Sequence, residues 1–325
     1  MIEVDLLVVG AGPAGLYAAY YAGFRELRTA VIDALPEPGG QVAALYPEKQ
    51  IYDIAGFPAV RGRDLVAALV DQAERFAPTW LLDQSAQELT RLPDGRLRIV
   101  TTKGTVLLTR SIVIAGGIGT FTPRPLPVGA DYLGRGIEYF VVDPNEYAGH
   151  NVLVVGGGDS ALDWALTLEP IAKSVTLIHR RPTFTAHESS LSRLQSSTAH
   201  VRTPYVLHDV TGDGALERVI VRDTGSGELV ELDCTRIVAA LGFTANLGPL
   251  TGWGLRIVDR HIGVDSRMFT GVEGVYAAGD ITDYPGKVRL ISVGFGEAAL
   301  AVNNAAVAAS PEQSLFPGHS SETAA

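Results

Sequence analysis

Two glycine-rich motifs constrain the fold of this chain more than any other feature. The first spans residues 10–15 and the second spans residues 156–161, and each lies between a short apolar run and a helix-forming segment. Both have the pattern G-x-G-x-x-G/A, which lets a strand turn sharply into a helix and lets the backbone approach a pyrophosphate. Backbone N–H groups at the helix N-terminus then hold that pyrophosphate. The sequence therefore predicts two dinucleotide-binding units in one chain.

Each of the three glycines in the first motif has a different role. Gly10 permits the tight turn, Gly12 lets the backbone approach the pyrophosphate, and Gly15 lets the helix pack closely on the strand. Asp33 follows Gly10 by 23 positions and ends the next apolar run, at residues 29–32. A carboxylate at this place accepts hydrogen bonds from an adenosine ribose. The alternative is a glycine turn with an unrelated surface aspartate, but spacing and context favour a nucleotide with a free 2′-hydroxyl.

The second motif has the same spacing but the opposite charge. Its candidate binding residues are Gly156, Gly158, Asp159, Ser160 and Ala161. The position equivalent to Asp33 is His179, and Arg180 and Arg181 follow it. Because a ribose 2′-phosphate repels a carboxylate and pairs with arginine, this site is predicted to bind NADPH, unless the arginines are only solvated surface charges. Nicotinamide donates hydride and flavin accepts it, so FAD is the expected occupant of the first site.

The same order of elements occurs twice along the chain. Each glycine motif is followed by a helix and a strand, then by short alternating strands typical of an antiparallel meander. We therefore expect an α/β fold with two Rossmann-like domains, for FAD and NADPH, each with a small antiparallel meander, the second domain inserted in the first. The predicted division is residues 1–117 and 245–325 for FAD and residues 118–244 for NADPH.

Cysteine usage excludes two kinds of chemistry. Cys234 is the single cysteine among 325 residues, so neither an intrachain disulfide nor a paired-thiol redox centre is possible. We interpret it as a small buried apolar residue. The seven histidines are not in metal-ligand spacings, and the sequence predicts no metal site.

The charge balance limits the possible partners. The net charge is −10 and the chain has no long basic run, which argues against nucleic acid and against an acidic membrane surface. No apolar run approaches the roughly 18 residues that span a bilayer, and the N-terminus does not resemble a signal peptide. The cytoplasm is the expected location.

Further segments extend the pattern over essentially the whole chain. They are residues 39–41 (GGQ), 45–49 (LYPEK), 278–280 (AGD) and 317–321 (PGHSS). Together with the two glycine motifs, they resemble the ferredoxin–NADP⁺ reductases of the thioredoxin-reductase-like type. Thioredoxin reductases carry Cys-x-x-Cys-Asp just before the second motif, whereas residues 140–143 here are FVVD. Because both cysteines of that motif are missing, direct dithiol exchange is excluded. Ala14 stands where related flavoproteins acting on low-molecular-weight disulfides carry a cysteine, which argues against that branch too.

The resemblance implies a set of FAD contacts and a partner subunit. Besides Gly10, Gly12, Ala14 and Gly15, the implied contacts are Asp33, Gln41, Tyr46, Ala86, Phe121, Asp280 and Ser321. In this family, Tyr46 would stack on one face of the isoalloxazine ring. His319 would belong to a C-terminal segment that covers the other face, often from the partner subunit, which implies a homodimer.

The predicted activity is electron transfer from NADPH through FAD to a one-electron carrier, ferredoxin or flavodoxin. No side chain is assigned a catalytic role, because the protein supplies binding, orientation and local charge. Two alternatives stay open: a reductase of another acceptor, such as a quinone, free flavin or small molecule, and a non-enzymatic redox-sensing flavoprotein. Since ferredoxins are usually acidic, a local basic patch is expected. Its candidates are Arg61, Arg63, Arg124, Lys287 and Arg289.

Overall fold

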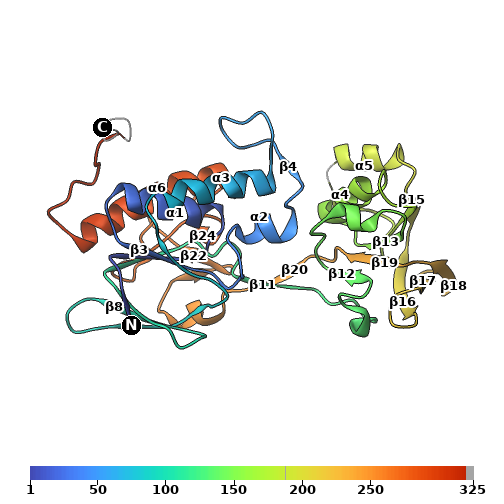
Figure 1. Cartoon of the computed structure of the whole chain (residues 1–325), viewed down its shortest axis with the longest axis horizontal. Coiled ribbons are helices and arrows are strands. Elements are labelled where there is room, and N and C mark those ends of the chain that lie inside the picture. The colour runs from blue at the N-terminus through green and yellow to red at the C-terminus, as the bar shows by residue number, and fades with distance from the viewer. Residues whose placement is uncertain (187, 320–325) are drawn as a thin grey trace. The chain divides into compact units, whose positions relative to one another are not determined.

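The computed structural model describes residues 1–186 and 188–319. The chain forms two compact units, and each is described by itself (Figure 1). The first unit comprises Met1–Phe121 and Ala245–Ala325, and the second unit comprises Thr122–Thr244. The second is thus inserted in the first, as the repeated order of elements predicts.

The boundaries of the units differ from the expected ones at one end. The first boundary falls after Phe121 instead of after residue 117, and the second falls before Ala245, where the expected division also lies. The crossover strands β11 (Thr120–Pro123) and β20 (Phe243–Asn246) pair with each other in a two-stranded sheet. Each crossover strand therefore runs across a boundary of the units.

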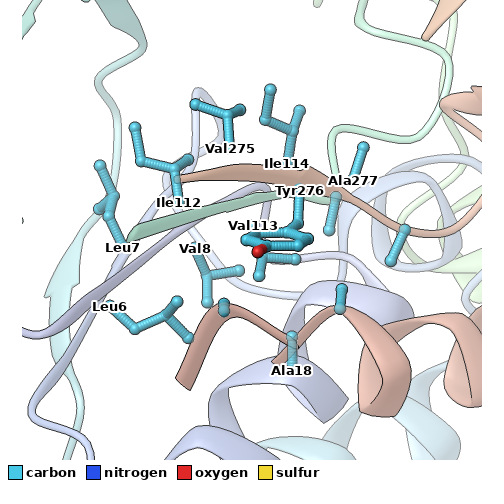
Figure 2. Close-up of a cluster of buried hydrophobic side chains, with 14 of the residues drawn as sticks. Leu6, Leu7, Val8, Ala18, Ile112, Val113, Ile114, Val275, Tyr276 and Ala277 are labelled. Carbon is cyan, nitrogen blue, oxygen red and sulfur yellow. The ribbon is translucent and has the colours of Figure 1, made fainter. Parts of the chain in front are cut away.

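The first unit is built on a five-stranded parallel sheet. Its strands, in spatial order, are β23 (Val275–Ala277), β10 (Ser111–Ile114), β2 (Leu6–Val9), β3 (Thr29–Ile32) and β6 (Thr79–Leu81). The three inner strands are almost fully buried, which explains why their sequences are continuous apolar runs and not alternating ones. Figure 2 shows side chains of β2, β10 and β23 beside one another, with Ala18 of the first helix against them.

Three helices lie together along one side of this unit in Figure 1: α1 (Pro13–Phe24), α3 (Gly62–Glu74) and α6 (Ile291–Ala309). α1 and α6 pack closely because both are rich in alanine and glycine. With 19 residues, α6 is long and apolar enough to span a bilayer, so the expectation that no run approaches this length is wrong. It packs against α1, β10 and β23 and carries a buried glutamate, Glu297, which is the arrangement of a core helix.

The antiparallel meander of the first unit comprises β7 (Ala86–Arg91), β8 (Leu97–Thr101) and β9 (Val106–Thr109). Residues 2–9 form two short strands. β1 (Ile2–Glu3) pairs with β9, and after Val4 and Asp5 the chain enters the central sheet as β2. The remaining elements of this unit are α2 (Gly40–Leu45), β4 (Gln50–Ile51), β5 (Val60–Arg61), β21 (Ile257–Val258), β22 (His261–Gly263), β24 (Thr282–Asp283) and the 3-10 turn Gly248–Gly252.

The second unit repeats this design on a smaller scale. Its parallel sheet has the order β12 (Ile137–Glu138), β19 (Arg236–Ala239), β13 (Asn151–Val155), β14 (Ser174–Ile178) and β15 (His200–Arg202). Helices α4 (Asp159–Leu168) and α5 (Glu188–Gln195) pack against each other, and two 3-10 turns lie at Ala130–Tyr132 and Pro144–Tyr147. The meander comprises β16 (Tyr205–Thr211), β17 (Arg218–Asp223) and β18 (Leu229–Asp233). The predicted fold class, with two Rossmann-like domains, is confirmed.

Candidate functional site

A cavity in the first unit opens at the carboxyl ends of its parallel strands, where open α/β sheets bind ligands. Eight predicted FAD contacts line it: Gly10, Gly12, Ala14, Asp33, Gln41, Tyr46, Ala86 and Asp280. Sequence analysis missed other lining residues, among them Leu247, Pro249 and Ile291. These are ordinary apolar residues of the segment 245–325, and only folding brings them beside the first glycine motif.

The glycine motif keeps the floor of this cavity free of side chains. Gly10 has φ +110°, and a Cβ there would lie 2.4 Å from the carbonyl oxygen of Ala115. A Cβ on Gly15 would lie 1.8 Å from the carbonyl oxygen of Gly10, so the helix starts directly against the turn and Gly15 itself does not line the cavity. Gly40 faces Gly12 closely, since a Cβ on Gly40 would lie 2.8 Å from the Cα of Gly12. A Cβ on Gly12 itself would have only the Cα of Gly40 within 4 Å among the described residues, at 3.9 Å, which leaves room for a phosphate-bearing ligand to approach this backbone.

Asp33 is held in place by backbone donors at the end of β3. Its Oδ2 accepts a hydrogen bond from the N–H of Ala11 at 2.5 Å, and its Oδ1 accepts one from the N–H of Leu35 at 2.8 Å. Burial raises the pKa of Asp33, while these backbone hydrogen bonds act in the opposite direction. Each carboxylate oxygen keeps acceptor capacity for another donor. The carboxylate is thus oriented to receive ribose hydroxyls, and the site fits the adenosine half of FAD.

A second group of polar side chains lies elsewhere along the same cavity. Burial raises the pKa of Tyr46 to about 12, and the nearby charges of Asp280 and Asp53 add to this effect, so the phenol stays protonated at neutral pH. The amide of Gln41 lies against Gly117, where a Cβ would approach its Nε2 to 2.6 Å. An aromatic ring, an amide and a carboxylate lining one cavity suit a planar ring that carries polar edges and a hydroxylated chain. The residues present therefore fit FAD.

The turn that carries Asp280 rests on a buried ion pair. The Nζ of Lys287 lies 2.5 Å from Oε1 of Glu297 and 3.0 Å from the carbonyl oxygen of Gly279. The other oxygen of Glu297 accepts the N–H of Gly279 at 2.8 Å. This network was not predicted from the sequence. The feature of the sequence that could have indicated the network is Glu297, because it is the one charged residue in α6.

The predicted basic patch needs correction. Lys287 was expected at the surface, yet its side chain is only 2% exposed and is committed to Glu297. Arg63 pairs with Glu48 at 2.8 Å, and Arg61 lies 3.9 Å from the same carboxylate. The remaining first-unit candidate, Arg289, pairs with Asp283 at 3.5 Å, and Arg124 belongs to the second unit. These four first-unit cations therefore do not form a patch of unpaired positive charge.

The second glycine motif forms the turn from β13 to α4. A Cβ on Gly156 would lie 2.3 Å from the carbonyl oxygen of Ala240, so this glycine is required by a close backbone approach. Gly158 precedes the helix, Asp159 and Ser160 are its first two residues, and Ala161 is buried beneath them. The N–H of Thr185 donates to the carbonyl of Gly157 at 2.8 Å, tying the loop after β14 to this turn.

The His179 ring lies against the turn of the second glycine motif, at Gly157. A Cβ on Gly157 would come within 2.2 Å of the His179 ring, and Phe184 stacks on the ring with centroids 5.4 Å apart. Among the residues described, the buried Nε2 of His179 has no hydrogen-bond partner. Burial lowers the pKa of His179, and the charges of Arg180 and Arg181 lower it further. The neutral ring thus supports the loop, while both arginines are exposed to solvent.

Of the remaining predicted FAD contacts, only His319 has a described side chain. Phe121 is part of β11, and nothing is described of its side chain. His319 is exposed, its ring packs edge-on against Phe316 at 5.2 Å, and it does not line the cavity. Ser321 lies outside the described residues. Within the described ranges, no group of three His, Cys, Asp or Glu residues is arranged to hold a metal ion.

Comparison with known proteins agrees with this geometry. Residues 4–305 match the pyridine nucleotide-disulphide oxidoreductases. The chain is similar to the thioredoxin reductase of Lactococcus lactis, with TM-score 0.78 and 26% identity, covering 94% of this chain and 99% of that one. A thioredoxin reductase of T. acidophilum gives TM-score 0.77 and 25% identity, covering 94% and 98%. The chain is therefore a two-domain flavoprotein oxidoreductase of the pyridine nucleotide-disulphide class.

Sequence relatives narrow that class. The chain is 58% identical to a ferredoxin–NADP reductase of Frankia alni, over 97% of this chain and 98% of that protein. It is 49% identical to a ferredoxin–NADP reductase of Halalkalibacterium halodurans, over 97% and 96%. The chain belongs to the ferredoxin–NADP reductases of the thioredoxin-reductase-like type, and its cofactors are FAD and NADPH.

Proposed function

We propose that this chain carries electrons from NADPH through FAD to ferredoxin. The observation that carries the proposal is the reversal of charge between two matched motifs. Asp33 ends the strand after the first motif, whereas His179 and the exposed Arg180 follow the second at the same register. One site thus suits a free ribose hydroxyl and the other suits a ribose phosphate. Ferredoxin as the acceptor is supported by the names of the relatives described above.

In this proposal, the chain's own residues bind the cofactors and orient them. The N-terminal end of α1, beginning at Gly12, would offer backbone N–H groups to the pyrophosphate of FAD, and Asp33 would accept from its ribose. Asp280, with its turn fixed by Glu297, faces the same cavity. Bound FAD supplies the chemistry, accepting a hydride and releasing single electrons. We assign no side chain the role of proton donor or nucleophile.

The single buried thiol, Cys234, favours a one-electron carrier, and not a disulfide, as the electron acceptor. Cys234 is 2% exposed, and burial raises the pKa of its thiol to about 12. A thiol that stays protonated and buried cannot attack a disulfide. With a single cysteine, the chain has no internal dithiol to relay electrons, and the proposal has them pass from the flavin to an external acceptor.

The proposal also assigns one cofactor to each unit and a second copy of the chain as a partner subunit. The first unit would hold FAD and the second unit NADPH, with the phosphate on Arg180 and Arg181. In a cytoplasmic homodimer, the C-terminal segment with His319 and Ser321 would cover the flavin of the partner subunit. Exposed apolar side chains on that segment, Leu315 and Phe316, support contact with another surface.

A small-molecule acceptor is the second candidate. It is favoured by one observation: the expected docking cations Arg61, Arg63 and Arg289 are each near a carboxylate, which weakens an electrostatic site for an acidic protein. Steady-state assays with NADPH and equal concentrations of oxidised ferredoxin, flavodoxin, a quinone and free flavin distinguish the acceptors. The proposal expects the highest kcat/KM with ferredoxin, and a higher value for a quinone or free flavin would overturn it.

A further inference from the structure

A buried arginine holds the beginning of the C-terminal segment. Arg25 follows the last turn of α1, and its guanidinium makes four hydrogen bonds. One nitrogen donates to Oδ1 of Asn303 at 2.8 Å and to the carbonyl of Leu315 at 3.2 Å. The other donates to Oε1 of Gln313 at 2.9 Å and to the carbonyl of Ser314 at 2.8 Å. All four acceptors belong to α6 or to the segment that follows it.

The environment of Arg25 is unusual for a cation. The residue is only 7% exposed, and among the described residues no carboxylate pairs with it. Burying an unpaired charge is costly unless hydrogen bonds satisfy it, and the fork of a guanidinium can serve several acceptors at once. Three of the four acceptors lie at residues 313–315. Arg25 therefore recovers most of its lost hydration only when this segment is in place.

The held segment leads directly to the aromatic residues of the tail. Ser314 Oγ donates to the carbonyl of Phe316 at 2.9 Å, and the Phe316 ring packs against His319. Phe316 is 60% exposed, so its own unit does not fix it by burial. The chain before Phe316 is contacted by Arg25 and more weakly by Arg110, at Ala309 and Ser310, and the N–H of Gln313 donates to the carbonyl of Ser310.

We infer that Arg25 is a positioning residue that fixes the course of the C-terminal segment and thereby sets where His319 is delivered. The delivery part rests on the proposed function, in which this segment covers the flavin site. The fixing of the segment itself does not depend on that function. The two parts can therefore fail separately.

Limited proteolysis of the FAD-bound protein tests the fixing of the segment. Arg25→Ala removes the donors, and Gln313→Ala removes one acceptor from a partly exposed position without disturbing the core. Arg28→Ala is the matched control, because Arg28 pairs with Asp5 and not with the tail. Cleavage within residues 310–319 should be about tenfold faster or more in Arg25→Ala, faster in Gln313→Ala and unchanged in Arg28→Ala. Equal cleavage rates in all variants would overturn the inference.

A double-mutant cycle tests the delivery of His319. The chain is ended after Leu315, with and without Arg25→Ala, and turnover with the electron acceptor is measured. We expect Arg25→Ala to change kcat in the same direction as the truncation and to have no further effect in the truncated chain. An undiminished effect of Arg25→Ala in the truncated chain would overturn delivery through the tail. Faster proteolysis with unchanged turnover in both single variants would retain the anchor and reject the covering role.

Discussion

Lys287 and Glu297 form a buried ion pair beneath the turn that presents Asp280 to the cavity. Their charged atoms lie 2.5 Å apart, and the side chains are 2% and 4% exposed. Both partners also hold Gly279, one through its carbonyl and the other through its N–H. The pair thus links α6 to the cofactor cavity.

Breaking this pair should destabilise the protein strongly. Glu297→Gln leaves the Lys287 ammonium buried without its ion-pair partner, which costs about 3–5 kcal/mol of unfolding free energy. Urea unfolding of the FAD-bound protein measures this loss. The double variant Glu297→Gln with Lys287→Met should regain much of it, because no unpaired charge is left. A loss below about 1 kcal/mol in the single variant is incompatible with the pair as described.

Asp33→Asn should weaken FAD binding by roughly 10- to 100-fold. The amide NH₂ must face either the N–H of Ala11 or that of Leu35, which sets donor against donor. Equilibrium binding of FAD to the apoprotein gives the affinity. Asp131→Asn, in the second unit, is the control. Unchanged FAD affinity in Asp33→Asn would contradict the ribose assignment.

FAD binding should also depend on pH through Asp33. Because burial raises the pKa of Asp33, its carboxylate is protonated at a higher pH than an exposed aspartate. The pKa of Asp33 in the folded apoprotein exceeds its value in the unfolded chain, so the apoprotein loses stability as Asp33 ionises with rising pH. FAD binding, in contrast, needs the ionised carboxylate as an acceptor. FAD affinity should therefore fall as pH is lowered through the raised pKa. A flat affinity profile down to the ordinary aspartate pKa near 3.9 would contradict this.

Arg180→Ala should reduce the preference for NADPH over NADH by about 10- to 100-fold, since a charge-assisted hydrogen bond contributes about 1.5–3 kcal/mol. The ratio of kcat/KM values for the two nucleotides is the measurement. Arg218→Ala is the matched control, because Arg218 is exposed on β17 and pairs with Glu231. Equal use of NADPH and NADH by the unmodified protein would show that the assignment of the arginines is wrong.

His179→Phe should leave the nucleotide preference within about twofold. The phenyl ring can keep the contacts with Gly157 and Phe184 while removing a buried nitrogen that has no partner among the described residues. His179→Ala should weaken NADPH binding, because the loop that carries Arg180 loses its support. If His179→Phe loses preference as severely as Arg180→Ala, the imidazole itself contacts the phosphate.

Local sequence patterns were sufficient for the fold and for the core of the candidate site. The two glycine motifs and their flanking apolar runs act over short distances, so β3 has the predicted bounds. Motif spacing also placed Asp33 at the end of β3, where it reaches the turn. These features depend on sterics within a strand–turn–helix unit and not on the rest of the chain.

Long-range contacts account for what the sequence did not predict. Arg25 bonds to Asn303, which is 278 positions away, and nothing local distinguishes Arg25 from the exposed Arg28. Lys287 follows Gly286 in a turn-forming sequence typical of the surface, yet tertiary packing buries it against Glu297. The strand β16 was also missed, because its sequence mixes polar and apolar residues and contains an irregular register at Leu207.

Anaerobic titration with NADPH tests the central claim most directly. The protein is reconstituted with FAD, the flavin absorbance is followed as NADPH is added, and oxidised ferredoxin is then supplied. We predict rapid bleaching by NADPH, much slower bleaching by NADH, and recovery of the absorbance when ferredoxin is added. Failure to retain FAD, or no bleaching by NADPH, would contradict the proposed electron transfer, and bleaching without recovery would exclude ferredoxin as the acceptor.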